Sequence, residues 1–156
     1  MKDAATLLAL AERVEALAGP DRDVDARVRY AIDAREYPGG EAFTLVEATD
    51  DHPAFEHVTR AGLLQQVARD GSARFTASLD AAMTLVPEGH TIQLSDWDAA
   101  VLREKGAWQA IVLPMGARGA MSQFTFSNRC DHAATPALAL TAAALRAHAA
   151  IAGEGE

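Results

Sequence analysis

The chain has 156 residues, of which 49% are hydrophobic and 23% charged, and its net charge at pH 7 is −8. This length and composition are typical of one folded domain and not of a disordered chain. The acidic balance argues against direct binding to nucleic acid, because no cluster of basic residues offsets it.

The compartment is expected to be the cytoplasm. The single cysteine, Cys130, cannot form a disulfide within the chain. The first residues lack the uninterrupted apolar core of a signal peptide, and no uninterrupted apolar run reaches the roughly 18 residues that a membrane helix needs. The sequence therefore predicts no membrane association.

Residues 1–34 predict a helical hairpin. Apolar residues recur at spacings of three and four over residues 3–18, and Asp3 is suited to cap that helix. Gly19-Pro20 ends it, and a second helix starts at Asp21. The apolar stripe of the second helix comprises Val24, Val28 and Ile32. Its expected solvent side comprises Asp23, Asp25, Arg27 and Arg29.

Residues 35–74 form a variable segment with the least regular pattern. Alternating apolar residues predict a strand over residues 42–47. A helix is expected from Pro53 to about Arg69, although Gly62 lies within it.

Residues 75–152 predict a core with the order helix, strand, strand, strand, helix. Ser78 is suited to cap the short first helix, whose inward side comprises Leu79, Ala82, Met83 and Val86. The strands are expected at residues 90–95, 107–113 and 119–127. The middle strand is apolar on both faces, which is typical of a central strand covered twice. The expected core residues of these strands are Ile92, Leu94, Trp108, Ala110, Val112, Phe124 and Phe126.

The final helix is the most regular stretch. Thr135 is suited to cap it and Pro136 to its first turn, and the alanines and leucines that follow favour a helix strongly. This helix is apolar nearly all round, so we expect it to be buried on more than one side. One sheet face would not cover so much apolar surface, and the sequence therefore predicts a homo-oligomer, most simply a dimer.

Helices before and after three antiparallel strands predict an α+β fold, a three-layer α-β-α sandwich with three to four strands and helices on both faces. Residues 75–89, which end in Pro87-Glu-Gly89, and residues 133–151 resemble a group of small phage and prophage-type proteins, some with a phage α-β-α sandwich domain. Residues 6–26 match more loosely. The resemblance implies the same fold and a location in the host cytoplasm, and it implies no reaction.

No sequence motif assigns catalysis to this chain. It contains neither a phosphate-binding loop nor a serine-hydrolase elbow, so neither enzymatic activity nor a cofactor is expected. Cys130 with His132, and His52 with His57, lack the usual spacing of a structural zinc site, so no metal is expected. Cys130 is expected to fill a small space, and His132 to lie in the loop before the final helix.

Four residues in polar segments beside the predicted strands are the candidate ligand-binding set: Trp97, Arg103, Arg118 and Arg129. A tryptophan beside arginines can stack on a base while an arginine binds a phosphate. The alternative is that these arginines pair with surface acids.

Two functions follow from the sequence. The first is a small phage-type protein that sequesters a nucleotide-derived signal in counter-defence. The second is an acidic interaction module, an inhibitor or adaptor, that binds a host or phage protein through its acidic helices.

Overall fold

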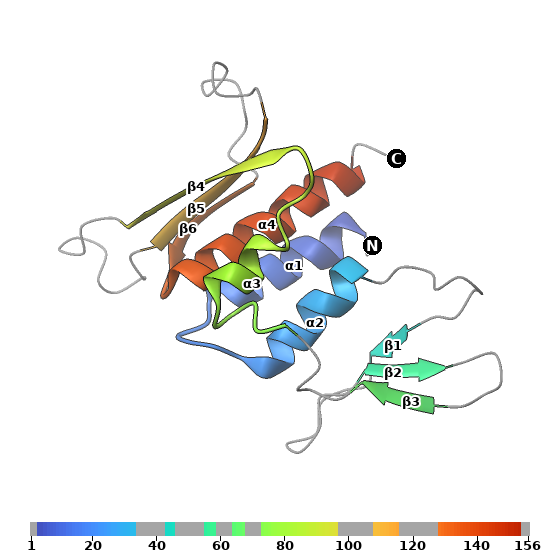
Figure 1. Ribbon diagram of the computed structural model, residues 1–156. Coiled ribbons are helices and arrows are strands. Elements are labelled where there is room, and N and C mark those ends of the chain that lie inside the picture. Colours follow the sequence, from blue (N-terminus) through green and yellow to red (C-terminus); the bar gives the residue numbers. More distant parts are fainter. Residues whose placement is uncertain are drawn as a thin grey trace.

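Helices and two antiparallel sheets make up the part of the chain that the structure describes (Figure 1). This computed structural model describes residues 3–33, 43–45, 55–58, 64–67, 73–96, 108–115 and 128–153. The helices are α1 (Ala4–Glu15), α2 (Arg22–Asp33), α3 (Leu79–Met83) and α4 (Pro136–Gly153). The strands are β1 (Phe43–Leu45), β2 (Phe55–Val58), β3 (Leu64–Val67), β4 (His90–Asp96), β5 (Trp108–Pro114) and β6 (Arg129–Ala133).

The larger sheet has the order β4-β5-β6, with β5 in the centre as its apolar composition predicts. All seven residues of β4 pair with β5, from His90 opposite Pro114 to Asp96 opposite Trp108. The third strand, β6, was not predicted. The strand expected at residues 119–127, with Phe124 and Phe126, lies outside the described residues.

The smaller sheet corrects the helix expected from Pro53 to Arg69. This sheet has the order β1-β2-β3, so residues 55–58 and 64–67 are strands and not one helix. Phe55 and Val58 begin and end a segment that is too short to show a helical period, and Gly62 falls in the connection between the two strands. In short apolar segments, periodicity does not distinguish a helix from a strand. A glycine between two such segments favours a turn.

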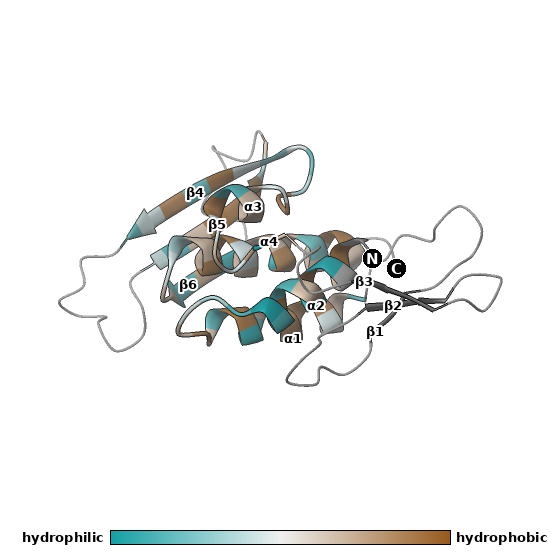
Figure 2. Ribbon diagram, turned by 60° about the horizontal axis from the view of Figure 1, so that its bottom comes forward, coloured by the Kyte–Doolittle hydropathy of each residue, from teal (hydrophilic) through white to brown (hydrophobic). Residues whose placement is uncertain are grey.

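Helix α4 lies between the larger sheet and α1 (Figure 2). It packs on all three strands of that sheet, on α1 and on α3. Its buried residues comprise Ala137, Leu138, Ala139, Leu140, Thr141, Ala142, Ala143, Ala144, Leu145, Ala147 and Ala149. The chain therefore covers most of this helix by itself, although Ile151 near its C-terminal end is 40% exposed. The homo-oligomer stays a prediction from the sequence.

The burial of α4 also explains why this helix is so apolar. By length and hydropathy, Pro136–Gly153 could cross a membrane, which differs from the expectation drawn from uninterrupted apolar runs. Within the fold 61% of this segment is buried, as in the core helix of a globular domain.

The fold is α+β, with a three-strand antiparallel sheet packed against α1 and α4. Ala110 and Val112 of β5 are fully buried on the helix side, and Trp108 packs half-buried against the same core. Ile111 and Leu113 alternate with them and are half-buried on the second face. The described residues show helices on the first face of this sheet.

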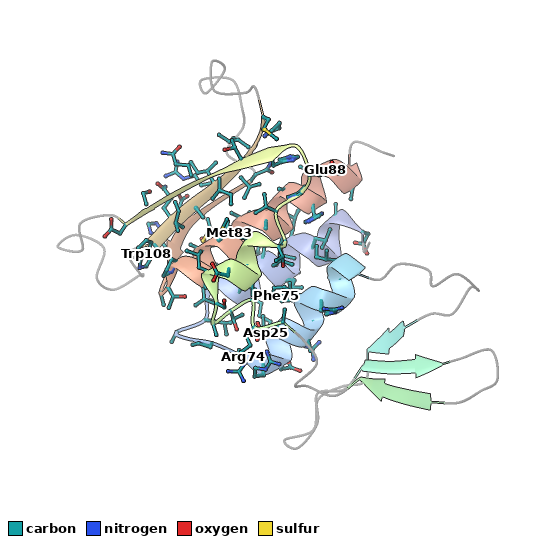
Figure 3. All side chains as sticks on the ribbon, viewed as in Figure 1. Asp25, Arg74, Phe75, Met83, Glu88 and Trp108 are labelled. Carbon is teal, nitrogen blue, oxygen red and sulfur yellow. The ribbon has the colours of Figure 1, made fainter. Side chains whose placement is uncertain are left out.

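The predicted helix caps are confirmed. The backbone N–H groups of Thr6, Ala81 and Leu138 donate hydrogen bonds of 3.0, 3.3 and 3.2 Å to the side chains of the caps. These caps are Asp3, Ser78 and Thr135. One inward-facing prediction in α3 is wrong: Met83 is 51% exposed, because α3 ends there after five residues and turns only its Ala82 side into the core (Figure 3).

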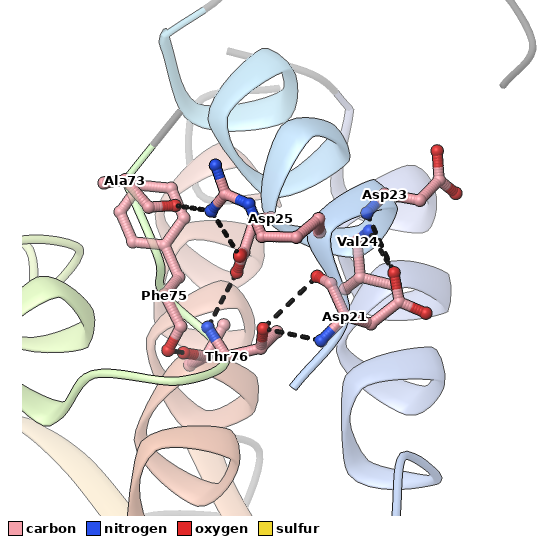
Figure 4. A network of polar contacts seen from close by, with 9 residues as sticks. Asp21, Asp23, Val24, Asp25, Ala73, Phe75 and Thr76 are labelled. Atoms are coloured by element: carbon pink, nitrogen blue, oxygen red, sulfur yellow. Dashed lines mark hydrogen bonds and ion pairs between the residues drawn. The ribbon is translucent and has the colours of Figure 1, made fainter. Parts of the chain in front are cut away.

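A buried polar cluster fixes α2 to the segment before α3 (Figure 4). Asp25, expected in solvent, is fully buried. Its carboxylate accepts a 2.7 Å hydrogen bond from the backbone N–H of Thr76 and a 2.8 Å bond from the guanidinium of Arg22. The Thr76 hydroxyl accepts a 2.9 Å bond from the N–H of Asp21. Asp25 lies three residues before buried Val28, at the margin of the apolar stripe, where a polar residue is buried if it finds partners.

The Asp25→Ala variant is expected to lose about 3 kcal/mol of unfolding free energy, because it leaves a buried backbone N–H and a half-buried guanidinium without their carboxylate. Urea denaturation followed by circular dichroism measures this loss. The matched control is Asp23→Ala, whose ion pairs with Arg13 and Arg27 lie nearer the surface and are worth about 1 kcal/mol or less. Equal losses in the two variants would contradict the assignment.

Candidate functional site

Only one of the four predicted ligand-binding residues has a described position. Trp97, Arg103 and Arg118 lie outside the described residues. Arg129 is the first residue of β6, and its Nε donates to the carboxylate of Asp131 in an ion pair. Arg129 thus pairs with an acid, which is the alternative to ligand binding that the sequence left open.

The predicted ligand-binding residues outside the described strands belong to two different connections of the larger sheet. The connection that contains Trp97 and Arg103 runs from the end of β4 to the start of β5, and the connection that contains Arg118 runs from the end of β5 to the start of β6. These attachments are at opposite ends of seven-residue strands, about 20 Å apart. Trp97 and Arg118 therefore belong to segments anchored at different ends of the sheet.

A polar row crosses all three strands of this sheet, and we define it as Ser95, Gln109, Asp131 and Arg129. The Ser95 hydroxyl donates to the Gln109 side-chain oxygen at 3.3 Å, and the Gln109 amide donates to the Asp131 carboxylate at 2.9 Å. Gln109 precedes Ala110, which faces the helices, so the row lies on the second face. Gln109 is only 8% exposed there.

A β-bulge in β6 shapes the middle of the polar row. Ala110 is opposite Cys130, but Trp108 is opposite Ala133, so Asp131 and His132 together face Gln109. A bulge changes the direction in which side chains leave a strand and is frequent beside binding sites. His132, expected in a loop, lies on this strand, and its buried Nδ1 forms no hydrogen bond within the described part of the chain.

Three members of the polar row were not predicted from the sequence, although a signal for them exists. Gln109 is a lone polar residue within an otherwise apolar central strand, and Ser95 precedes Asp96 at the end of an alternating one. A polar residue at such a position needs a hydrogen-bonding partner when it is buried. The partner, Asp131, could not be identified because β6 itself was not predicted.

The outer edge of β6 is closed by an ion pair between two helices. Arg146 of α4 donates to the carboxylate of Glu15 at 2.6 Å and to the backbone oxygen of Arg129 at 2.8 Å. Glu15 of α1 accepts from the backbone N–H of Asp131 at 3.1 Å. Burial raises the pKa of Glu15, but hydrogen bonding and the charge of Arg146 outweigh it and hold that pKa below its usual value.

Cys130 lies on the helix side of β6, is fully buried, and donates from its thiol to Glu15 at 3.4 Å. Burial and then the neighbouring carboxylate charge raise the pKa of this thiol to about 12. A nucleophilic cysteine requires an accessible thiolate, so the structure gives Cys130 a packing role, as expected.

Cys130 is expected to resist alkylation by iodoacetamide in the folded protein at pH 8, where only about one thiol in ten thousand is ionised at a pKa near 12. Mass spectrometry of the labelled chain measures the reaction. The same protein in 8 M urea serves as the control, because the exposed thiol then reacts as an ordinary cysteine. Rapid labelling of the native chain would show that Cys130 is accessible.

The described residues contain no group of three histidines, cysteines or acids placed to hold a metal ion. Most acids of the N-terminal helices are also engaged within the chain. Asp3 and Asp21 cap α1 and α2, Asp23 and Asp25 pair with arginines, and Glu15 pairs with Arg146. These acids stabilise the fold and are not a free acidic surface.

His148 of α4 packs half-buried beside α3, with its Nε2 2.8 Å from the backbone oxygen of Leu85. Burial lowers the pKa of this imidazole, and the nearby charge of His90 lowers it further, while the bond to Leu85 opposes both. The unfolded chain therefore binds a proton at His148 at a higher pH than the folded chain does.

The stability from this difference is complete above the unfolded pKa of about 6.5 and is lost as the pH falls through the lower folded value. We expect the free energy of unfolding to decrease from pH 7 to pH 5, and the His148→Gln variant to show a flatter dependence. Urea titrations at several pH values measure both slopes. Identical slopes in parent and variant would contradict the assignment to His148.

Comparison of the chain with family models, with curated proteins and with solved structures finds no match. The resemblance to phage and prophage-type proteins therefore stays a prediction from the sequence.

Proposed function

We propose that the protein binds an anionic, nucleotide-like small molecule at the polar row and thereby sequesters it. The observation that carries the proposal is the row itself: Ser95, Gln109, Asp131 and Arg129 form one hydrogen-bonded line across three strands, on the face opposite the helices. Hydroxyl, amide and guanidinium groups in one line offer the donors and acceptors that a base, a sugar and a phosphate require.

The ion pair with Asp131 sets the direction of the Arg129 guanidinium. Asp131 lies two residues further along β6, so the pair draws the guanidinium toward Gln109 and Ser95. Ser95 is two residues before Trp97 in the sequence. In this proposal Arg129 binds phosphate, Trp97 stacks on the base and Arg103 adds positive charge. Arg118 belongs to the connection from β5 to β6, and its role in ligand binding stays a prediction from the sequence.

The proposal includes a second layer over the polar row, which completes the three-layer sandwich expected from the sequence. Its support is the burial of Gln109 and the half-burial of Ile111 and Leu113 on that face. Apolar side chains on a sheet are normally covered by another layer. In a phage or prophage setting, a ligand enclosed there is withdrawn from the host, which is the counter-defence role that we propose.

A binding function is favoured over the acidic interaction module. The module would need unpaired acids on the N-terminal helices, but five of these acids cap helices or pair with arginines. Binding is also favoured over thiol catalysis, because Cys130 is buried beneath the opposite face of the sheet.

The experiment is a ligand search followed by a matched set of arginine variants. Heat-denatured protein should release a compound that absorbs near 260 nm, and mass spectrometry identifies it. Arg129→Ala and Arg103→Ala should then weaken binding about tenfold or more in calorimetry, because a hydrogen bond to a charged group contributes about 1.5–3 kcal/mol.

One variant controls for the general loss of an arginine. Arg27→Ala, which removes an ion pair on α2, should bind within about twofold of the parent. The proposal is overturned if no nucleotide is released and none binds in a thermal-shift screen, or if Arg129→Ala binds as well as Arg27→Ala.

A further inference from the structure

Strand β4 is an edge strand of unusual regularity. Its seven residues pair with β5 without a bulge, and the described residues place no strand on its other side. The sequence His90–Asp96 contains no proline or lysine, the residues that most often protect an edge from pairing, and its acidic residue, Asp96, lies at the end of the strand. None of its residues is fully buried.

The opposite edge of the same sheet is protected. There Glu15 and Arg146 bond to the backbone N–H of Asp131 and the backbone oxygen of Arg129, which would otherwise be open to another strand. The bulge and the shorter length of β6 protect that edge further. The two edges thus differ, and β4 is the one suited to pairing.

The sequence of β4 is complementary to itself when it runs antiparallel and is centred on Gln93. That register pairs Gln93 with Gln93, Ile92 with Leu94, Thr91 with Ser95 and His90 with Asp96. An imidazole thus faces a carboxylate at both ends, and amide, apolar and hydroxyl groups face their own kind between them. Opposite polar groups and apolar pairs across strands stabilise a sheet. If the register is shifted by two residues, His90 is no longer opposite Asp96, and the imidazole–carboxylate pairs are lost.

We propose that the protein forms a two-fold symmetric dimer by antiparallel pairing of β4 with β4 of a second copy. Directly opposed residues of an antiparallel pair point to the same face, so Ile92 and Leu94 of both copies continue the core face. The helices of both copies then lie on one side of a continuous sheet. A two-fold axis through Gln93 makes the interface closed, so the assembly stops at two.

The dimer differs from the one expected from the sequence in the surface that it uses. The expectation rested on the apolar sides of α4, most of which the chain covers itself. The edge of β4 is formed by backbone groups together with half-exposed side chains, and strand addition at such an edge is a common mode of association. The proposal is independent of ligand binding, because none of its pairs needs a ligand.

The test combines mass measurement with two cysteine variants. Light scattering of the parent protein at 100 µM should give twice the 16.5 kDa of the chain. In the Gln93→Cys variant, mild oxidation should yield a disulfide-linked dimer. Opposed residues of an antiparallel pair have Cα atoms about 4.5–5.5 Å apart, within the range of a disulfide.

Thr91→Cys is the matched control. In the Gln93-centred register it lies four residues, or about 13 Å, from its copy along the strand, so it should not form the cross-link. The parent should not cross-link either, because Cys130 is buried. A monomeric parent, a dimer in which Gln93→Cys fails to cross-link, or equal cross-linking of both variants would overturn the proposal.

Discussion

Helix α4 is apolar on nearly every side, and the rest of the chain has to cover most of it. Burial of apolar surface is the main favourable term in folding, and this helix places eleven residues in the core. The larger sheet covers one side, α1 covers the other and α3 lies alongside. The positions of these elements follow from that requirement, and the alanines of α4 allow their backbones to approach closely.

Polar contacts then fix how the covering elements are joined. Glu15 connects α1 to β6 and, through Arg146, to α4, while Asp25 and Thr76 connect α2 to the segment before α3. Apolar packing alone is tolerant of small shifts, but a buried carboxylate is stable only where its partners are in place. These contacts therefore specify one arrangement among several that would cover α4 equally well.

The sequence predicted the elements whose signals are local. The caps Asp3, Ser78 and Thr135, the ends of α4 and the strands β4 and β5 each depend on neighbours within four residues. Features that depend on distant partners were missed. The burial of Asp25 requires Thr76, which lies 51 residues away. The polar row requires β6, whose five residues mix charged and apolar types without alternation. Of the polar row, only Arg129 was named from the sequence, and the residues that surround it were not.

The cluster around Asp25 has a consequence for chain length. The chain leaves the core at the end of α2 and returns beside its beginning, where Arg22 donates a long hydrogen bond of 3.5 Å to the backbone oxygen of Ala73. A helix of 12 residues separates these two points by about 18 Å, a gap that six extended residues can span. The cost of closing a loop grows only with the logarithm of its length. Residues 34–72 therefore occupy a position where segments of very different length are compatible with one core, which makes it a natural place for one domain to acquire another.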